Sequence, residues 1–506
     1  GDEVTAAVVA TDDGAGNIVL SKKQASHETA WEKFREWKAE GKRVSVKIAE
    51  AVNAGVVCYL EGIRAFIPAS KLALHYVENP AEYVGQTVDA VVITVDEENG
   101  KQISARIQEF FKRYQLSEIL RKSNAYKQQG VSVMAIMSYL FCLVFRNRSM
   151  FLDMQSGKAP AFRKDTVYRL RNATHINWMR FTTLLSAKII GTTVEPLTNE
   201  KRRNAFVIDD TVFERNGSQK VELLAKVYDH AHHRYTRGFR MLTLGWSDGV
   251  TFLPVNSCLL STGKQENRLS EGKIPDSRSN GAKMRELAVK KGTEVISDLI
   301  SEAQSAGICA DYVLFDSWFS SPKVIRSVRE KNLDVVAMVK KSSKIHYSFQ
   351  GELLSCKEIY ARCKKRRGRS RYLLSVPIEI CGGEPENAPI PAKLVFVRNR
   401  SNRKDYLALI STDTTLTEDE IIQLYGKRWD IEVFFKTSKS VLRLTGECRS
   451  LSYDAMCAQC AIVFARYMFL AVGIRENQDL RSAGPLFCLV ADELADISLK
   501  DGLASD

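Results

Sequence analysis

Two short apolar runs that lead into acidic residues stand out in the pattern of hydrophobic and polar positions along this chain. Residues 206–208 (Phe-Val-Ile) precede Asp209, and residues 312–315 (Tyr-Val-Leu-Phe) precede Asp316. Continuous apolar runs of this length are typical of strands buried on both faces of a sheet. We therefore expect two central strands that end on Asp209 and Asp316, at the sheet edge where sites form.

The remaining pattern predicts a mixed α/β architecture. Apolar residues at helical spacing recur over 109–200 and again before the second acidic strand, whereas alternating runs between the two acidic residues indicate strands. The expected helices are 116–127, 131–145, 165–185 and 283–307, and the expected strands are 222–228 and 239–245. A basic helix pair within 109–200 could contact DNA in a groove, or these helices could simply pack on the core.

Residues 332–412 read as a β-rich insertion. Alternation at 372–378 and 393–397 predicts strands on either side of a Gly/Pro-rich loop at 382–391. A compact sheet would not need so many residues between its last acidic strand and the helical segment that follows.

That helical segment, LYGKRWDIEVFFKTSK, carries four polar residues at steps of three, four and seven. Tyr425, Arg428, Glu432 and Lys439 therefore fall on one stripe of a helix, with Lys436 beside them. Many such stripes are only solvated helix faces. The two aspartates upstream favour a site instead.

Three carboxylates, on Asp209, Asp316 and Glu432, are what metal-dependent phosphoryl transfer requires. Oxygen ligands suit Mg²⁺ or Mn²⁺, and two such ions can activate the attacking oxygen and stabilise the leaving one. Asp210 could replace Asp209 as a ligand, because neighbours on a strand face opposite ways. Each Asp alone could equally be a turn former.

The charge of the chain points to a polyanionic partner. Residues 1–108 hold 12 Lys and Arg against 16 Asp and Glu, a net charge of −4, which leaves +17 on the rest of a chain whose total is +13. Lys and Arg contacts to phosphates dominate affinity for nucleic acid. The densest basic runs contain Lys340 and Lys341, and Lys364, Lys365, Arg366 and Arg367.

These motifs resemble the DDE transposases of bacterial insertion sequences, in particular the IS-four group. Its Y-(2)-R-(3)-E-(6)-K signature matches Tyr425, Arg428, Glu432 and Lys439 at every spacing. The resemblance covers about residue 110 to the end. It implies an RNase H-like fold with a β insertion that contacts the transposon end.

The resemblance also implies roles for the matched residues. Asp209, Asp316 and Glu432 would hold two Mg²⁺ (or Mn²⁺) ions. Arg428 and Lys439 would steady phosphates, and Tyr425 would contact the DNA backbone. Water would cut the element end, and the freed 3′-hydroxyl would attack target DNA. We expect a homodimer on DNA, in the bacterial cytoplasm and associated with the nucleoid.

Residues 1–108 contain an internal repeat of a different kind. Six identical residues recur at one constant offset between 1–21 and 85–104, among them Gly1 and Gly85, and Gly16 and Gly100. The full copy resembles the RNA-binding repeat of ribosomal protein S-one, which implies a five-stranded OB-fold barrel that binds single-stranded RNA. Its last strand runs into residue 110 without a linker, and the truncated first repeat suggests that a mobile element entered a host gene.

The predicted fold class is thus α/β, an RNase H-like mixed sheet with a β-rich insertion and N-terminal helices, preceded by an all-β OB-fold barrel. The N-terminal part is predicted to comprise a partial OB repeat with a helical linker (1–40) and a complete OB repeat (41–108). The rest is predicted to comprise a helical region (109–200), the first part of the catalytic core (201–331), the β-rich insertion (332–412), and the catalytic helix with the rest of the core (413–506).

Two further features are explained by packing in the protein core. The pair Cys457 and Cys460 is a lone CxxC inside an apolar run, which favours core packing over zinc. The run 455–474 is long enough to cross a membrane, but Gln459 and Arg466 interrupt it, so we expect a buried helix and no membrane.

The alternative function is that of an RNA-binding, translation-associated protein whose C-terminal part is an inactive passenger.

Overall fold

The chain folds into two compact units. Unit 1 comprises residues 1–106 and 489–506, and unit 2 comprises residues 107–488. The computed structural model describes residues 7–10, 19–21, 33–34, 36–52, 55–60, 63–68, 72, 80–92, 99–145, 149–155, 162–198, 202–229, 232–367, 370–381, 388–399 and 405–476. Most of the predicted loop at 382–391, and residues 477–506 of the last predicted segment, lie outside these ranges.

Unit 1 contains a four-stranded antiparallel sheet in the order β5-β4-β3-β6. Its elements are β3 (Arg43–Val52), β4 (Gly55–Leu60), β5 (Ile63–Pro68), the 3₁₀ helix η2 (Pro80–Tyr83) and β6 (Thr87–Val91). A separate antiparallel pair joins β1 (Ala7–Ala10) to β2 (Val19–Ser21). In the part of the chain that is described, these strands do not amount to the predicted five-stranded barrel.

The prediction that the last strand of that barrel runs into residue 110 is wrong, because helix α2 (Asn99–Arg113) occupies this segment. The apolar residues Ile107, Phe110, Phe111 and Tyr114 follow the spacing of a helix and are buried. Burial of this apolar stripe decides the conformation of the segment, although the sequence repeat suggested a strand.

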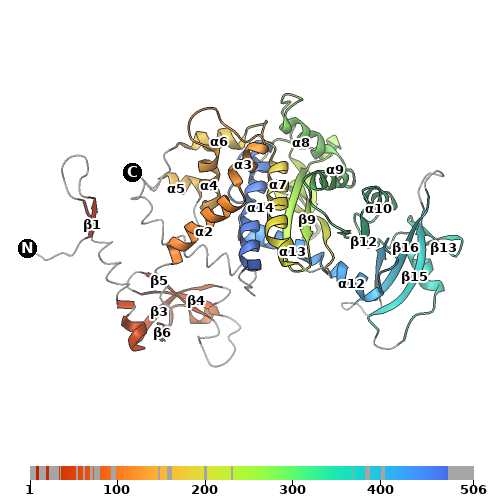
Figure 1. Ribbon diagram of the computed structural model, residues 1–506, viewed down its shortest axis with the longest axis horizontal. Helices are drawn as coiled ribbons and strands as arrows, with labels where there is room; N and C mark the ends of the chain where they lie inside the picture. The colour runs from red at the N-terminus through yellow and green to blue at the C-terminus, as the bar shows by residue number, and fades with distance from the viewer. Residues whose placement is uncertain are drawn as a thin grey trace, which may run out of the picture. The chain divides into compact units, whose positions relative to one another are not determined.

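Helix α14 (Tyr453–Glu476) is a long apolar helix that packs against several of the other helices of unit 2 (Figure 1). Preceding it are α3 (Leu116–Lys122), α4 (Val133–Leu143), α5 (Met150–Gln155), α6 (Lys164–Arg171), α7 (Trp178–Ile189), the short turns η3 (Ile190–Val194), η4 (Glu195–Leu197) and η5 (Gln265–Asn267), α8 (Asn280–Val289), α9 (Gly292–Ser305), α10 (Pro322–Arg329), α11 (Cys356–Arg362), α12 (Glu418–Gly426) and α13 (Trp429–Ser440).

Helix α14 is apolar and long enough to cross a membrane, yet 89% of its apolar window is buried inside the protein. The predicted buried helix is therefore confirmed. Its one fully buried arginine, Arg466, pairs with Glu447 at 2.9 Å and donates to the carbonyl oxygens of Leu140, Phe141 and Leu442. These bonds account for a charge in the core, since a buried cation requires a full set of partners.

One 11-stranded mixed sheet runs through unit 2 in the order β10-β9-β7-β11-β12-β17-β16-β15-β13-β14, with β8 paired to β9. Its strands are β7 (Ala205–Glu214), β8 (Ala225–Asp229), β9 (Arg234–Ser247), β10 (Phe252–Leu260), β11 (Tyr312–Phe315), β12 (Asp334–Met338), β13 (His346–Phe349), β14 (Glu352–Ser355), β15 (Tyr372–Ile380), β16 (Ile390–Arg398) and β17 (Tyr406–Ser411). This mixed α/β sheet is consistent with an RNase H-like core.

The strands of the predicted insertion extend the core sheet. β12 lies parallel to β11, and β17 pairs antiparallel with β12 before β16 and β15 continue outward. Figure 1 shows β13, β15 and β16 at the end of unit 2 opposite its N-terminal helices. Because one ladder connects the two parts, the insertion is held rigidly next to the central strands.

Two predicted helices are each split in the structure. The predicted helix 165–185 becomes α6 and α7, because Asn177 accepts the amide hydrogen of Arg180 at 2.9 Å and so starts a new helix. The predicted helix 283–307 becomes α8 and α9, separated by the extended backbone of Lys290 and Lys291. In both places the apolar periodicity continues across a short break that local backbone bonding imposes.

Candidate active site

The two aspartate segments are neighbours in the sheet. β7 and β11 are parallel and in register, with Ile208 opposite Phe315, so Asp209 and Asp316 follow matched positions on adjacent strands. The prediction that the first strand ends on Asp209 is wrong, since β7 continues to Glu214 as an antiparallel partner of β9. Asp209 instead marks the point where the parallel pairing stops.

Helix α13 brings Arg428 and Glu432 to the same place. The guanidinium Nη1 of Arg428 lies 2.6 Å from Asp209 Oδ2 and 3.4 Å from Glu432 Oε1, so one cation contacts both carboxylates. Tyr425 lies beside them, with its ring centroid 5.9 Å from the Arg428 guanidinium. Of the four residues of the predicted stripe, Arg428 thus contacts Asp209 directly, and Glu432 and Tyr425 lie beside Arg428.

The stripe itself is not on one continuous helix. The chain leaves α12 at Gly426 and enters α13 at Trp429, and the amides of Lys427 and Arg428 bond to carbonyls three residues back. Such bonds tighten the turn. Glu432 and Lys439 lie on α13, whereas Tyr425 lies on α12, so a single-helix geometry is wrong although the residues still converge.

Two half-buried polar residues, Lys427 and Asp430, fix this junction against the sheet. The Lys427 ammonium donates to the carbonyl oxygens of Arg203 (2.9 Å) and Asp248 (3.5 Å), and Asp430 accepts from Ser247 Oγ at 3.1 Å. Sequence reasoning missed both residues. Their spacing is the signal that could have found them. Lys427 and Asp430 are three residues apart and so share one side of the helical segment, next to the side that carries Arg428 and Glu432.

The electrostatics of the aspartates are those of crowded acids. Burial raises the pKa of Asp209 to about 8; Arg428 opposes this shift, and the charges of Asp316 and Glu432 add to it. Burial also raises the pKa of Asp316, against the Trp318 amide and Arg428. Acids held together in this way would be stabilised by a cation of higher charge than arginine.

The donor set fits a hard divalent cation, because carboxylate oxygens are the ligands that Mg²⁺ and Mn²⁺ prefer. The raised pKa of Asp209 is expected of a carboxyl in a site that binds additional positive charge. Among the residues described, however, no group of three or more His, Cys, Asp or Glu is gathered closely enough to hold a metal ion. The structure thus brings the three acids to one neighbourhood, with Arg428 between two of them.

Asp210, the alternative ligand, faces a different partner. Its carboxylate accepts from Arg240 Nε at 2.6 Å and also contacts the other end of that guanidinium. Arg240 in turn lies over the ring of Trp318, with 5.4 Å to the ring centroid. Neither Arg240 nor Trp318 was predicted, because the sequence does not reveal that β9 pairs with β7.

The predicted DNA-binding lysines occupy two places. Lys436 and Lys439 are exposed on α13. The Lys439 ammonium is attracted electrostatically by nearby carboxylates, among them those of Glu432, Asp210 and Asp229. Lys340 lies 5.0 Å from the centroid of the Trp318 ring, next to the acids. Lys341 turns away to the carboxylate of Asp405 and to the Tyr406 ring.

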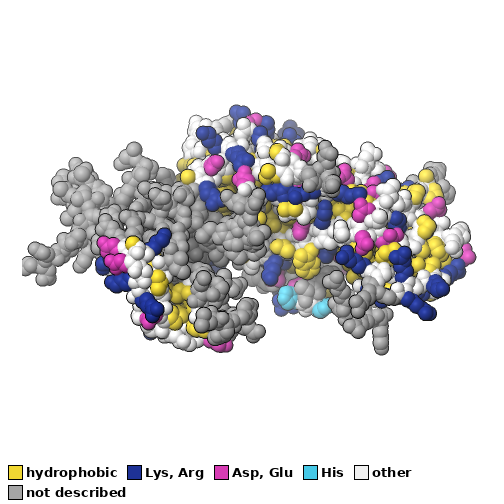
Figure 2. All heavy atoms as spheres, turned by 60° about the horizontal axis from the view of Figure 1, so that its bottom comes forward, with side chains coloured by type: hydrophobic (Ala, Val, Ile, Leu, Met, Phe, Trp, Pro, Cys, Tyr) yellow, Lys and Arg dark blue, Asp and Glu magenta, His cyan; other side chains and the backbone are white. Residues whose placement is uncertain are grey.

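The basic run at 364–367 lies on the insertion, between α11 and β15. Lys365 and Arg366 lie over the rings of Tyr360 (4.6 Å) and Tyr372 (4.4 Å), and Lys364, Arg366 and Arg367 are exposed. Figure 2 shows Lys and Arg side chains spread over the visible face of unit 2 among acidic and apolar ones. This run therefore lies in the segment that precedes β15, apart from the acids at β7 and β11.

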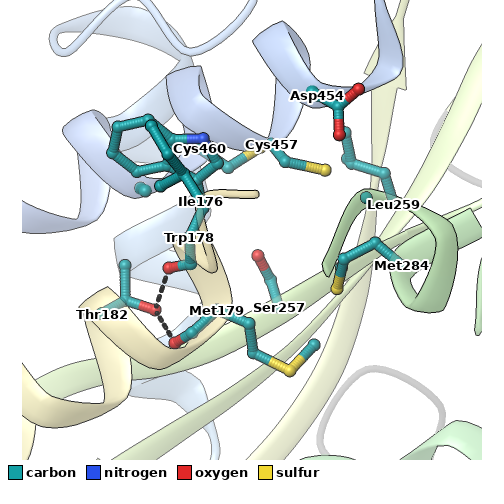
Figure 3. A pocket seen from close by; sticks show the side chains of 12 residues that line it. Ile176, Trp178, Met179, Thr182, Ser257, Leu259, Met284, Asp454, Cys457 and Cys460 are labelled. Carbon is teal, nitrogen blue, oxygen red and sulfur yellow. Dashed lines mark hydrogen bonds between the residues drawn. The ribbon is translucent and has the colours of Figure 1, made fainter. Parts of the chain in front are cut away.

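A small cavity of about 20 Å³ lies away from the acids, between α7, α14 and β10 (Figure 3). Its lining includes Trp178, Met284 and the two thiols of the CxxC pair, and it has room for about one water molecule. Burial raises the pKa of Cys457 and Cys460 well above the ordinary value, so both remain thiols. Core packing thus explains this pair, as the sequence indicated.

Comparison with known families identifies two domains. Residues 153–395 match the model of the DDE superfamily endonuclease, and residues 38–106 match that of the S1 RNA binding domain. The chain therefore contains a DDE superfamily endonuclease domain and an S1 RNA-binding domain. The endonuclease match includes Asp209 and Asp316 and stops before Glu432.

Curated relatives cover only a small part of the chain. Small ribosomal subunit protein bS1 of Mycolicibacterium smegmatis is 33% identical over 106 residues, 21% of this chain and 22% of the relative. The bS1 homolog of Bacillus cereus is 37% identical over 87 residues (17% and 22%), and 4-hydroxy-3-methylbut-2-enyl diphosphate reductase of Clostridium acetobutylicum is 32% identical over 93 residues (18% and 14%). The chain thus spans less than a quarter of each of these relatives.

Proposed function

We propose that this protein is a DNA transposase of an insertion sequence of the IS-four group, which cuts element ends and joins them to target DNA. The observation that carries the proposal is the register of β7 and β11, with Arg428 contacting Asp209 and Glu432. Two acids at matched positions on parallel strands and a third on a helix form the donor set of metal-dependent phosphoryl transfer.

Asp209, Asp316 and Glu432 are the residues that would hold divalent cations, with Asp210 as the alternative to Asp209. When bound, two Mg²⁺ or Mn²⁺ ions supply an activated oxygen nucleophile and stabilise the leaving oxygen. Arg428 can then pair with a phosphate oxygen of the DNA, because a guanidinium binds phosphate as readily as carboxylate. Lys427 and Asp430 keep α13 in place while Arg428 changes partner.

DNA contacts away from the acids would come from exposed cations. Lys436 and Lys439 lie on α13 together with Glu432, and Lys340 lies beside Trp318. A further basic run on the insertion comprises Lys364, Lys365, Arg366 and Arg367. Tyr425 would lie against the backbone near the cut. Each phosphate contact adds to affinity and to its salt dependence. A homodimer on DNA and a place in the bacterial cytoplasm, at the nucleoid, complete the proposal.

Glu432→Gln tests the proposal most directly. The amide keeps the size of the side chain and removes its charge, so cleavage of DNA carrying the element ends in Mn²⁺ should be lost while binding in chelator is retained. Asp419→Asn is the matched control, because Asp419 is an exposed carboxylate on α12 that faces Arg371. Cleavage by the Glu432→Gln protein at the wild-type rate would refute the site.

A second function has support from the other unit. The S1 match and the bS1 relatives favour an RNA-binding, translation-associated protein with an inactive C-terminal part. Binding of single-stranded RNA without any cleavage of end-bearing DNA, with Mg²⁺ or Mn²⁺ present, would select this alternative. Cleavage without joined product would instead identify a nuclease.

A further inference from the structure

A two-stranded ribbon extends the sheet beyond the acids. Residues 238–247 of β9 pair with β7, whereas residues 234–237 of the same strand pair only with β8. Successive residues of a strand face opposite sides, so the ribbon has an inner and an outer side. Val227 and Thr236 on the inner side are each 6% exposed, which shows that the ribbon packs on the protein through that side.

The outer side of the ribbon carries two tyrosines and two cations. In the strand register Tyr228 lies opposite Tyr235, and Lys226 lies opposite Arg237. The two tyrosine rings meet edge to face with 5.2 Å between their centroids, and Tyr235 is 71% exposed. Lys226 and Arg237 are also exposed, and neither has an ion-pair partner among the residues that the structure describes. Exposed cations beside an exposed ring suit a polyanion.

The two cations repel each other in the free protein. Like charges that lie directly opposite each other destabilise a pair of strands, so an anion bound between Lys226 and Arg237 would stabilise the ribbon. Arg237 precedes Arg240 on β9 by three residues, or about 10 Å, and Arg240 contacts Asp210 beside the other acids. The ribbon therefore begins close to the place where the proposed function puts a DNA phosphate.

We propose that the outer side of the β8–β9 ribbon binds the backbone of duplex DNA beside the site that is cut. Lys226 and Arg237 contact phosphates, and Tyr235 packs its exposed ring against a deoxyribose. A duplex that follows β9 outward meets the ribbon about 3 to 5 base pairs from the cut, because base pairs are spaced by about 3.4 Å. This inference rests on the proposed function, and the duplex is either the element end or the target.

The first test measures how the affinity of the full chain for an unrelated DNA duplex depends on salt, in chelator. The double variant Lys226→Ala and Arg237→Ala should lower the slope of log affinity against log salt by about two, one for each phosphate contact. Tyr235→Ala removes no charge and should weaken binding by a similar factor at every salt concentration. The control pair, Arg278→Ala and Lys283→Ala, removes two exposed charges at α8 and should leave the slope unchanged. A wild-type slope in the ribbon variant would overturn the inference.

A charge reversal separates DNA binding from folding. Lys226→Glu places opposite charges across the ribbon, so this variant should unfold at a higher urea concentration than wild type while it binds DNA less tightly. The loss of binding then cannot come from a damaged fold. Arg237→Glu should give the same pair of changes. Higher stability together with wild-type affinity for DNA would contradict the proposed contact.

Photocrosslinking identifies the duplex. With p-benzoylphenylalanine in place of Tyr235, irradiation in chelator should link the ribbon to DNA carrying the element ends, about 3 to 5 base pairs from the cut. Crosslinks to an unrelated duplex alone would instead assign the ribbon to the target, and the absence of crosslinks to both would overturn the inference. Because no cleavage is needed, crosslinks in a protein that never cuts DNA would support the ribbon contact and contradict only the transposase function.

Discussion

In unit 2, Arg428 and Arg285 each join two acids from different elements, but the pKa values of the acids that they contact shift in opposite directions. Arg428 contacts Asp209 of β7 and Glu432 of α13. Arg285 of α8 contacts Glu222, which precedes β8, and Asp454 of α14. The chemistry is the same, but burial raises the pKa of Asp209 to about 8 while the pKa of Glu222 is lowered.

Hydrogen bonds explain the difference. Burial favours protonation of Glu222, but its two oxygens accept from Arg285 and from the amides of Tyr453 and Lys273, which together outweigh burial. Asp209 is buried among other acids and accepts from Arg428 and the Asp210 amide, which do not outweigh burial. A buried acid whose hydrogen bonds outweigh the cost of burial stabilises the fold. A group of buried acids whose hydrogen bonds do not outweigh that cost indicates a site that binds additional positive charge.

Asp316→Asn should have the largest effect on activity. Loss of one acid from the site should reduce DNA cleavage by at least about 100-fold, the order of magnitude for a single electrostatic contact in a reacting site. The matched control is Asp311→Asn at the other end of β11, where Asp311 accepts the Asn204 amide at 3.3 Å. Equal cleavage rates for the two variants would contradict the assignment of the site.

Arg285→Met should have the largest effect on stability. It leaves Glu222 and Asp454 buried without their cation, so the free energy of unfolding should fall by about 3–5 kcal/mol. Urea unfolding followed by circular dichroism measures this change. Arg278→Met removes an exposed partner of Asp276 and should leave the unfolding curve unchanged. A similarly small effect of Arg285→Met would show that its network is not structural.

Asp209→Asn should change stability in the opposite direction. A carboxyl whose folded-state pKa is raised to about 8 destabilises the folded protein at pH 7, so its replacement by a neutral amide should raise the free energy of unfolding in chelator, on the order of 1 kcal/mol. The same substitution should abolish cleavage, so stability and activity separate at this residue. A clear loss of stability would mean that the Asp209 pair with Arg428 is a structural ion pair like that of Arg285.

Glu222→Gln sharpens the comparison through pH, with the smallest effect. The folded-state pKa of Glu222 lies below its ordinary value of 4.5, so its stabilisation is present above that pH and is lost as the pH falls through the lower folded-state pKa. Wild type should exceed the variant in stability at pH 7, and the difference should shrink as the pH falls below 4.5. A constant difference across this range would refute the role of the Glu222 charge.

Prediction from sequence succeeded for residues whose neighbours are close along the chain. The apolar runs before Asp209 and Asp316 are strands, and the spacing of Arg428 and Glu432 produces their contact across one helical turn. The breaks that end α6 and α8 were not foreseen, because a helix break depends on backbone bonding as much as on apolar periodicity. The strand predicted to run into residue 110 is instead part of α2, for the related reason that burial of the apolar stripe on α2 favours a helix.

The sequence by itself identified the residues that we propose carry the chemistry: the two aspartates, the helical Tyr, Arg, Glu and Lys, and the basic body of the chain. Tertiary structure alone decided which groups lie near them. Arg240 arrives through the pairing of β9 with β7, Trp318 through the turn after β11, and Lys340 through the parallel pairing of β12 with β11. The physical reason is that sequence periodicity records which face of an element is buried. The pairing of distant strands depends on packing of the whole sheet, which no local pattern encodes.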